Sequence, residues 1–219
     1  MTVPEAQGCP VCHDPAGWFL TADGKHYFRC PTCAARFVDR AARPEPTAEH
    51  AHYLHHENDP GDPRYRAFLS RLADPLLEVL PARAEGLDYG CGPGPALAAM
   101  LTEAGHRMEV WDPFFAADPA ALDRTYDFIT CTEVAEHFHD PAAEFARLRA
   151  ILRPGGVLGV MTCFQTDDAR FEAWHYRKDP THVVFYKEDT FCWISDKFGW
   201  TVRFPRKDVA ILSSPGTGR

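Results

Sequence analysis

Leu87-Asp88-Tyr89-Gly90-Cys91-Gly92-Pro93-Gly94-Pro95 is a short apolar segment that ends in a carboxylate and breaks into a glycine-rich turn. Residues 96–104, which follow, are rich in alanine and stop at Gly105, as expected for a helix. Three glycines at alternate positions remove three β-carbons, so that a ligand can lie against bare amides at the helix N-terminus. The pattern predicts a nucleotide-like ligand. It does not match the dinucleotide fingerprint G-x-G-x-x-G/A, because Pro95 stands where Gly or Ala is required.

Three further segments extend this pattern. Residues 107–112 are an apolar-rich strand that ends in Asp112, residues 126–137 read YDFITCTEVAEH, and residues 152–161 read LRPGGVLGVM. Asp112 comes 112 − 90 = 22 positions after the first glycine of the turn. In doubly wound folds an acid about 20 residues on accepts hydrogen bonds from ribose hydroxyls. These segments therefore predict parallel strands that hold a ribose-containing ligand.

The four segments together resemble the motifs of class I S-adenosylmethionine-dependent methyltransferases, over about residues 81–213. The resemblance implies an α/β fold, with a seven-stranded Rossmann-like sheet and helices on both faces, and S-adenosylmethionine as cofactor. By the same resemblance Asp88 and the glycines hold the methionine moiety, Asp112 holds the ribose, and Thr132 and Glu133 lie beneath the cofactor. The implied cofactor-binding residues are Asp88, Tyr89, Gly90, Cys91, Gly92, Gly94, Asp112, Pro113, Cys131, Thr132 and Glu133.

The sulfonium of such a cofactor is already an activated methyl donor, so the protein mainly has to align an acceptor and exclude water. A hydroxyl or protonated amine acceptor also needs a base. His137 and His182 follow predicted strands, at the sheet edge where ligands bind, and are the candidate catalytic residues. For His137 a packing or capping role stays an alternative. Phe114 and Phe115, directly after Pro113, are candidates for packing against the adenine, and ordinary packing within the fold stays an alternative.

The N-terminal region carries a metal-binding pattern. Cys9-Pro10-Val11-Cys12 and Cys30-Pro31-Thr32-Cys33 are two C-x-x-C pairs with 17 residues between them. This spacing is typical of a four-thiolate zinc site, and the residues between the pairs alternate as in a hairpin with Asp23-Gly24 at its tip. Residues 1–40 are therefore predicted to form a zinc ribbon with structural Zn²⁺. Two roles stay open, one that only stabilises the N-terminus and one that recognises a substrate or partner.

Residues 41–80 are expected to form a linker and an N-terminal helical lid. The linker holds several prolines and four crowded histidines, and apolar residues then recur at helical spacing from Pro63 to Leu80, where Pro75 is expected to kink or divide the helix. By resemblance, Tyr53, His55 and His56 are lid or substrate-contact candidates. The methyltransferase domain is expected over residues 81–213, and residues 214–219 are expected to be a disordered tail.

Composition and net charge restrict the classes of partner that this protein can be expected to bind. The net charge of −8 argues against binding driven by phosphate neutralisation, and no run approaches the ~18 apolar residues of a membrane span. The N-terminus has no secretory signal pattern, which predicts a cytoplasmic protein. A methyltransferase for a small-molecule or sugar-like acceptor is favoured. An RNA methyltransferase, with a basic ribbon edge formed by Arg29, Arg36, Arg40 and Arg43, and a non-catalytic scaffold that binds the cofactor are the alternatives.

Overall fold

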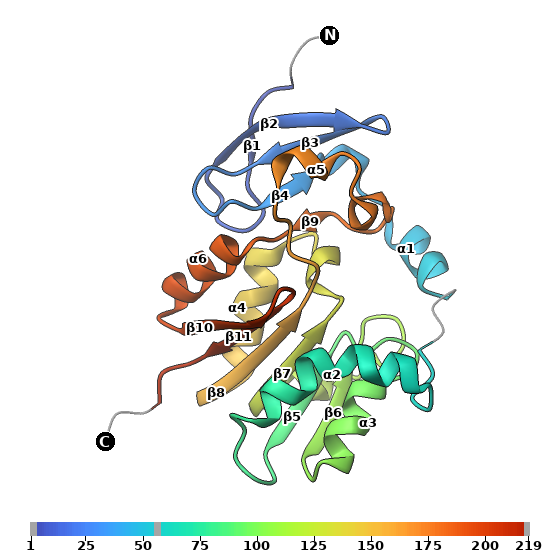
Figure 1. Cartoon of the computed structure of the whole chain (residues 1–219), viewed down its shortest axis with the longest axis vertical. Helices are drawn as coiled ribbons and strands as arrows, with labels where there is room; N and C mark the ends of the chain where they lie inside the picture. The colour runs from blue at the N-terminus through green and yellow to red at the C-terminus, as the bar shows by residue number, and fades with distance from the viewer. Residues whose placement is uncertain (1–3, 55–57, 217–219) are drawn as a thin grey trace.

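The computed structural model describes residues 4–54 and 58–216, so the lid candidates His55 and His56 lie outside the described residues. The molecule contains two β-sheets that lie one above the other along its long axis, the smaller near the N-terminus and the larger below it (Figure 1). Strands of the larger sheet are β5 (Glu85–Tyr89), β6 (Arg107–Trp111), β7 (Tyr126–Thr132), β8 (Leu152–Met161), β10 (Thr201–Arg206) and β11 (Val209–Ser213).

The larger sheet runs in the order β10-β11-β8-β7-β5-β6. Neighbouring strands from β6 to β8 are parallel, whereas β11 is antiparallel to both β8 and β10. The α/β prediction is confirmed, but the described residues contribute six strands rather than seven. The region before β7, where a further strand would have completed the expected count, forms the 3₁₀ helix η2 (Pro119–Leu122), with Asp118 accepting a hydrogen bond from Ala120 N at 2.9 Å.

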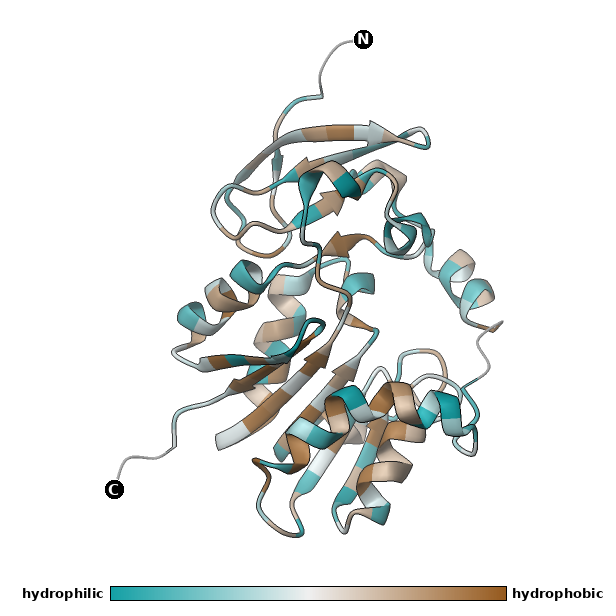
Figure 2. Ribbon diagram, in the orientation of Figure 1, coloured by the Kyte–Doolittle hydropathy of each residue, from teal (hydrophilic) through white to brown (hydrophobic). Residues whose placement is uncertain are grey.

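Helices cover both faces of this sheet. Leucines of α2 (Pro63–Leu77) and α3 (Ala96–Glu103) pack against one face, and residues of α4 (Pro141–Ile151) and α6 (Glu188–Phe198) pack against the other. Figure 2 shows hydrophobic residues along the central strands and hydrophilic positions on the outer surfaces of the helices. Pro75 lies inside α2 without dividing it, and α6 ends at Gly199, whose φ of 67° suits a glycine cap.

The smaller sheet contains the predicted ribbon. Its order is β1-β2-β3-β4-β9, formed by β1 (Gln7–Gly8), β2 (Pro15–Ala22), β3 (Lys25–Arg29), β4 (Arg36–Val38) and β9 (Val184–Phe185). The hairpin of β2 and β3 agrees with the sequence pattern, whereas no pattern indicates the addition of β9 from far along the chain. β9 pairs with β4 through Phe37 opposite Val184, and ribbon residues share one hydrophobic cluster with the larger domain. The ribbon is thus fixed to the larger domain.

Short helices complete the chain. They are α1 (Pro46–Tyr53), α5 (Asp168–Phe171), η1 (Arg40–Ala42), η3 (Ala135–His137) and η4 (His175–Lys178). In the predicted tail, Ser214 N and Gly155 N donate hydrogen bonds to Gly156 O at 2.9 Å and Pro215 O at 3.0 Å, so this part of the tail is tied to the start of β8. Within the described residues, the helices are too short or too polar to cross a membrane.

Candidate functional site

The glycine turn between β5 and α3 is shaped by close contacts. Gly90 N donates to Trp111 O at 2.7 Å, which joins the turn to the end of β6. Gly90 and Gly92 have φ angles of 79° and 65°, a region that favours glycine. A β-carbon on Gly94 would lie 1.8 Å from the backbone oxygen of Asn58. The missing β-carbons therefore let Asn58 and Val134 pack directly against the turn, which fixes its backbone at the edge of the cavity.

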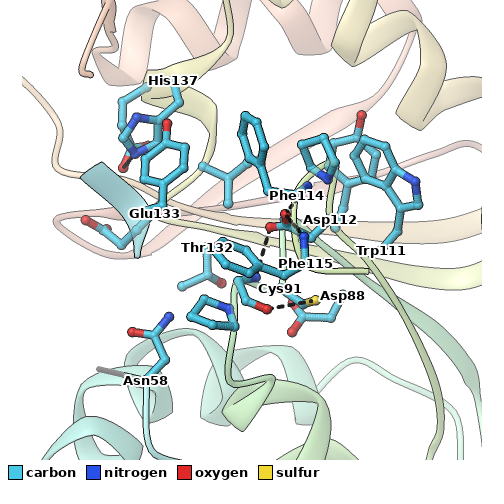
Figure 3. A pocket seen from close by; sticks show the side chains of 18 of the residues that line it. Asn58, Asp88, Cys91, Trp111, Asp112, Phe114, Phe115, Thr132, Glu133 and His137 are labelled. Carbon is cyan, nitrogen blue, oxygen red and sulfur yellow. Dashed lines mark hydrogen bonds and ion pairs between the residues drawn. The ribbon is translucent and has the colours of Figure 1, made fainter. Parts of the chain in front are cut away.

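Asp112 follows β6 and is directed at this turn (Figure 3). Its Oδ2 accepts a hydrogen bond from Gly92 N at 3.0 Å, and its Oδ1 accepts from Phe114 N at 2.8 Å and Phe115 N at 3.1 Å. A carboxylate has about four acceptor positions, so one remains after these three bonds. Asp112 is both a local organiser of the turn and a hydrogen-bond acceptor on the cavity wall, which fits a ligand with ribose hydroxyls.

Asp88 lies in β5 just before the turn and is buried. Its Oδ1 accepts a hydrogen bond from the Thr130 hydroxyl at 2.7 Å. Burial raises the pKa of Asp88 to about 6, and this hydrogen bond only partly opposes the effect. A cationic group in the cavity would favour the ionised carboxylate, which fits the ammonium group of a methionine moiety.

A cavity of about 860 Å³ lies at the carboxyl ends of β5, β6 and β7. Its volume is near the upper end of the ~300–1,000 Å³ usual for ligand pockets, which leaves room for a cofactor and a small acceptor. The predicted cofactor residues that line it are Asp88, Tyr89, Gly90, Cys91, Gly92, Gly94, Asp112, Pro113, Thr132 and Glu133. Cys131 is fully buried in β7 and is not among the lining residues.

Two glutamates follow β7 and line the cavity beside His137. Glu133, directly after β7, has a positive φ of 52°, and burial together with the charge of Glu136 raises its pKa to about 9. Glu136 is completely buried in η3. The hydroxyl of Tyr176 contacts both, donating to Glu136 Oε1 and lying 3.2 Å from Glu133 Oε2. This part of the cavity, called the acidic end below, therefore carries an excess of acidic groups.

His137 and His182 both lie at this acidic end, and His137 is on the far side of the cavity from Asn58 and Cys91 (Figure 3). The two ring centroids are 4.7 Å apart, and Nδ1 of each ring lies at hydrogen-bond distance from a backbone carbonyl: His137 from Thr181 O at 3.1 Å and His182 from Tyr176 O at 2.7 Å. Burial lowers the pKa of His182 below its ordinary value, so its neutral imidazole predominates at neutral pH.

The helix α1, which comes from the N-terminal part of the chain, covers part of the cavity. The ring of His50 stacks on Phe114 with centroids 5.0 Å apart, and the ring of Tyr53 lies 5.7 Å from Phe114 and 5.3 Å from His137. His139 lies 2.9 Å from Glu49 of the same helix. The described part of the predicted lid thus reaches both Phe114 and the acidic end.

The four cysteines of the N-terminal region also meet. Their Sγ atoms all lie within 4.8 Å of one another, with Cys9 and Cys33 3.6 Å apart and Cys12 and Cys30 3.3 Å apart. Each C-x-x-C turn is followed by a residue of positive φ, His13 at 69° and Ala34 at 59°. This repeated geometry gathers four thiols around one point, and the donor set fits tetrahedral Zn²⁺.

Sequence reasoning missed some residues of the site. Glu136 lies within a quoted motif but receives no role from it, and its only sequence signal is its adjacency to His137. Asn58 and Tyr176 carry no local pattern, because their places in the site depend on contacts with the glycine turn and with the two glutamates.

Comparisons with known proteins agree with this geometry. A family model described as a methyltransferase domain matches residues 52–203. A biotin biosynthesis bifunctional protein from Bordetella avium is 33% identical over 44% of this chain, and a ubiquinone biosynthesis O-methyltransferase from Histophilus somni is 36% identical over 29% of it. Each match spans 25% of the relative's own length.

Solved structures show the same fold. An O-methyltransferase family protein from Burkholderia thailandensis aligns with a TM-score of 0.54 and 21% identity, over 82% of this chain and 66% of that one. A methyltransferase from Galdieria sulphuraria aligns with a TM-score of 0.51 and 16% identity, over 72% of this chain and 76% of that one. Because the family model matches more than half of the chain, this protein belongs to the class I S-adenosylmethionine-dependent methyltransferases.

Proposed function

We propose that this chain transfers a methyl group from S-adenosylmethionine to an oxygen of a small-molecule acceptor. The observation that supports this most directly is that the glycine turn and Asp112 share a cavity with His137 and His182. A cofactor on the turn and an acceptor at the acidic end would be neighbours. The bound cofactor supplies the activated methyl group, so the chain's own residues need only bind the cofactor and the acceptor, orient the acceptor and remove its proton.

Each part of the cavity has a proposed task. The glycine turn and Asp88 hold the methionine end of the cofactor, and Asp112 offers its remaining acceptor position to the ribose. Because a carbonyl oxygen only accepts, the Nδ1 atoms of His137 and His182 donate and their Nε2 atoms carry lone pairs. One of these Nε2 atoms would receive the acceptor's proton directly. The α1 helix and Phe114 would exclude water.

Contacts of the ribbon arginines favour a small acceptor over RNA. Arg36 is buried and pairs with Asp168, which also binds Arg29 at 2.6 Å. Arg43 donates to His139 O at 2.5 Å. Three of the four arginines of the predicted basic edge are thus engaged within the chain. The Histophilus somni relative is an O-methyltransferase of ubiquinone biosynthesis, which also supports an oxygen acceptor.

We further propose that the four cysteines hold a structural Zn²⁺. Its site lies in the small sheet, whose β4 pairs with β9, two residues after His182. The zinc ribbon would then hold the loop of His182 in place rather than recognise a substrate.

Calorimetric titration with S-adenosylmethionine tests the proposed cofactor. The parent is expected to bind, and Asp112→Ala is expected to bind at least about tenfold more weakly, which corresponds to ~1.4 kcal/mol. Asp118→Ala is the matched control, since the Asp118 side chain also accepts a hydrogen bond from a backbone amide but is exposed and lies outside the cavity. Equal affinity of all three proteins would refute the assignment of Asp112. No binding by a folded parent would refute the proposed activity.

Turnover tests the second half of the proposal and separates an enzyme from a scaffold. A panel of small phenols, alcohols and sugars is scored for methylated product with the parent, His137→Ala and His182→Ala. Product formed by the parent and reduced at least tenfold in either variant is expected. Binding of the cofactor without methylation of any oxygen acceptor in the panel would contradict the oxygen-acceptor proposal.

A further inference from the structure

Glu136, His137 and His182 form a compact cluster at the acidic end of the cavity. One ligand atom from each side chain lies within 4.8 Å of the other two. Nε2 of His137 is 3.9 Å and Nε2 of His182 is 4.0 Å from the same carboxylate oxygen, Glu136 Oε1. These separations are too long for hydrogen bonds. A typical metal–nitrogen or metal–oxygen bond is ~2.1 Å long, so one ion can coordinate two atoms that are up to ~4.2 Å apart. The two histidine–glutamate separations are shorter than this limit.

The hydrogen bonds of the two rings prepare their Nε2 atoms as ligands. Both Nδ1–H groups donate to backbone carbonyls, of Thr181 and Tyr176 respectively. This fixes the tautomer in which Nε2 has a free lone pair, the arrangement that metal-binding histidines adopt. The side chains of His137 and His182 are only 16% and 9% exposed, and the rings of Tyr53 and Tyr176 pack against them. The two Nε2 atoms are therefore held in place before any ligand arrives.

Glu136 supplies an independent observation. Its side chain is 0% exposed, and within residues 4–54 and 58–216 its Oε2 has no hydrogen-bond partner. A buried carboxylate is costly unless its charge is paired. Neither neighbouring histidine comes within hydrogen-bond distance, and Tyr176 occupies only Oε1. A cation between the three side chains would give this carboxylate the positive charge that these neighbours do not provide.

We infer that Glu136, His137 and His182 bind a divalent first-row transition-metal ion. Two imidazoles and one carboxylate are a donor set that suits Mn²⁺, Fe²⁺, Co²⁺ or Zn²⁺. Three protein ligands leave coordination positions open, and the cluster lines the same cavity as the glycine turn. In a metal-bound form both Nε2 atoms would be ligands, so neither would act as the base named above. An oxygen of the acceptor would take an open position, where the ion would lower the pKa of its hydroxyl and the released proton would pass to water. That last step rests on the proposed function, whereas metal binding does not.

Binding of Mn²⁺, followed by the loss of its free electron paramagnetic resonance signal, tests the site in the full-length, zinc-loaded protein. Mn²⁺ prefers oxygen and nitrogen ligands, so the four thiolates do not compete for it. About one additional ion per chain is expected. His182→Gln and Glu136→Gln should each weaken binding at least about tenfold. His175→Gln is the matched control, because His175 lies on the nearby helix η4 but is exposed and outside the cluster.

Unchanged zinc content and an unchanged unfolding midpoint identify which variants are folded, and either folded variant suffices for the test. Absence of binding by the parent both of Mn²⁺ and of Co²⁺, which such donor sets bind more tightly than Mn²⁺, overturns the inference, and so does binding that survives in the folded variants. Titration of the same preparation with S-adenosylmethionine separates the two proposals. Cofactor binding without binding of either metal ion refutes the metal site alone, and metal binding without cofactor binding refutes the proposed activity alone.

Discussion

Replacement of Asp88 by asparagine should make the ligand-free protein more stable at neutral and alkaline pH. Asp88 is buried in β5, and its pKa of about 6 lies above the ordinary aspartate value of 3.8. The folded state therefore releases this proton at a higher pH than the unfolded state does. The contribution of protonated Asp88 to the free energy of unfolding is complete below about pH 3.8 and is lost as the pH rises through about 6. Asparagine carries no charge in either state and avoids this loss.

The size of the effect follows from the shift. A rise from 3.8 to about 6 corresponds to about 3 kcal/mol, of which about 1.4 kcal/mol appears between pH 5 and pH 8. Asp88→Asn keeps an oxygen that can accept the hydrogen bond from the Thr130 hydroxyl, so the loss of this bond adds no separate cost. The advantage of Asp88→Asn over the parent should thus grow by about 1.4 kcal/mol over this pH range.

Urea unfolding of the parent and Asp88→Asn at pH 5 and pH 8, without chelator, measures this difference. Asp118→Asn, an exposed position with a backbone hydrogen bond to its side chain, is the control and should show no such growth. S-adenosylmethionine should reverse the ranking at pH 8, since its ammonium group favours an ionised Asp88. A pH-independent difference between Asp88→Asn and the parent would refute the reasoning, because it would mean that Asp88 is not desolvated in the free protein.

Three further substitutions test other parts of the structure. Gly90→Ala should abolish cofactor binding in calorimetry and cost at least ~1–2 kcal/mol in urea unfolding, since its φ is 79° and its β-carbon would lie 2.5 Å from Val134. Cys30→Ser should lower zinc content and stability by several kcal/mol, whereas the exposed Cys192→Ser should change neither, as metal analysis and unfolding would show. Phe114→Ala should weaken cofactor affinity by roughly tenfold in calorimetry, because helix α1 loses its aromatic contact with the cavity wall. An unchanged affinity would show that α1 does not contribute to cofactor binding.

Much of the fold could be predicted because its signals are local. The apolar strands, the carboxylates that end them and the glycine turn all lie within short segments, and the structure brings Asp88, Gly90 and Asp112 to one cavity. The C-x-x-C pairs are equally local, and their four thiols do meet. Parallel strands whose carboxyl ends share an edge make such residues neighbours regardless of the loops between them.

The remainder depends on contacts that no short segment encodes. β9 joins the ribbon sheet through Phe37 and Val184, which are far apart in the sequence. Residues 116–123 resemble neither a clear strand nor a clear helix, and the Asp118 cap lets them close a 3₁₀ turn instead of a seventh strand. The burial of Glu136 and the close approach of Asn58 to Gly94 arise only when separate loops pack together.

The pairing of β9 with β4 has a thermodynamic consequence. A hydrogen-bonded path leads from the cysteine turns through β4 and β9 to the loop of His182, so we expect the order of that loop and the geometry of the thiols to be coupled. Such coupling is reciprocal for binding free energies. If the cysteines hold the proposed Zn²⁺, an acceptor that orders the loop should raise the affinity for zinc by the same factor by which zinc raises the affinity for the acceptor. Competition with a chelator measures this change in zinc affinity. A chelator should then act as an inhibitor that no excess of S-adenosylmethionine fully relieves.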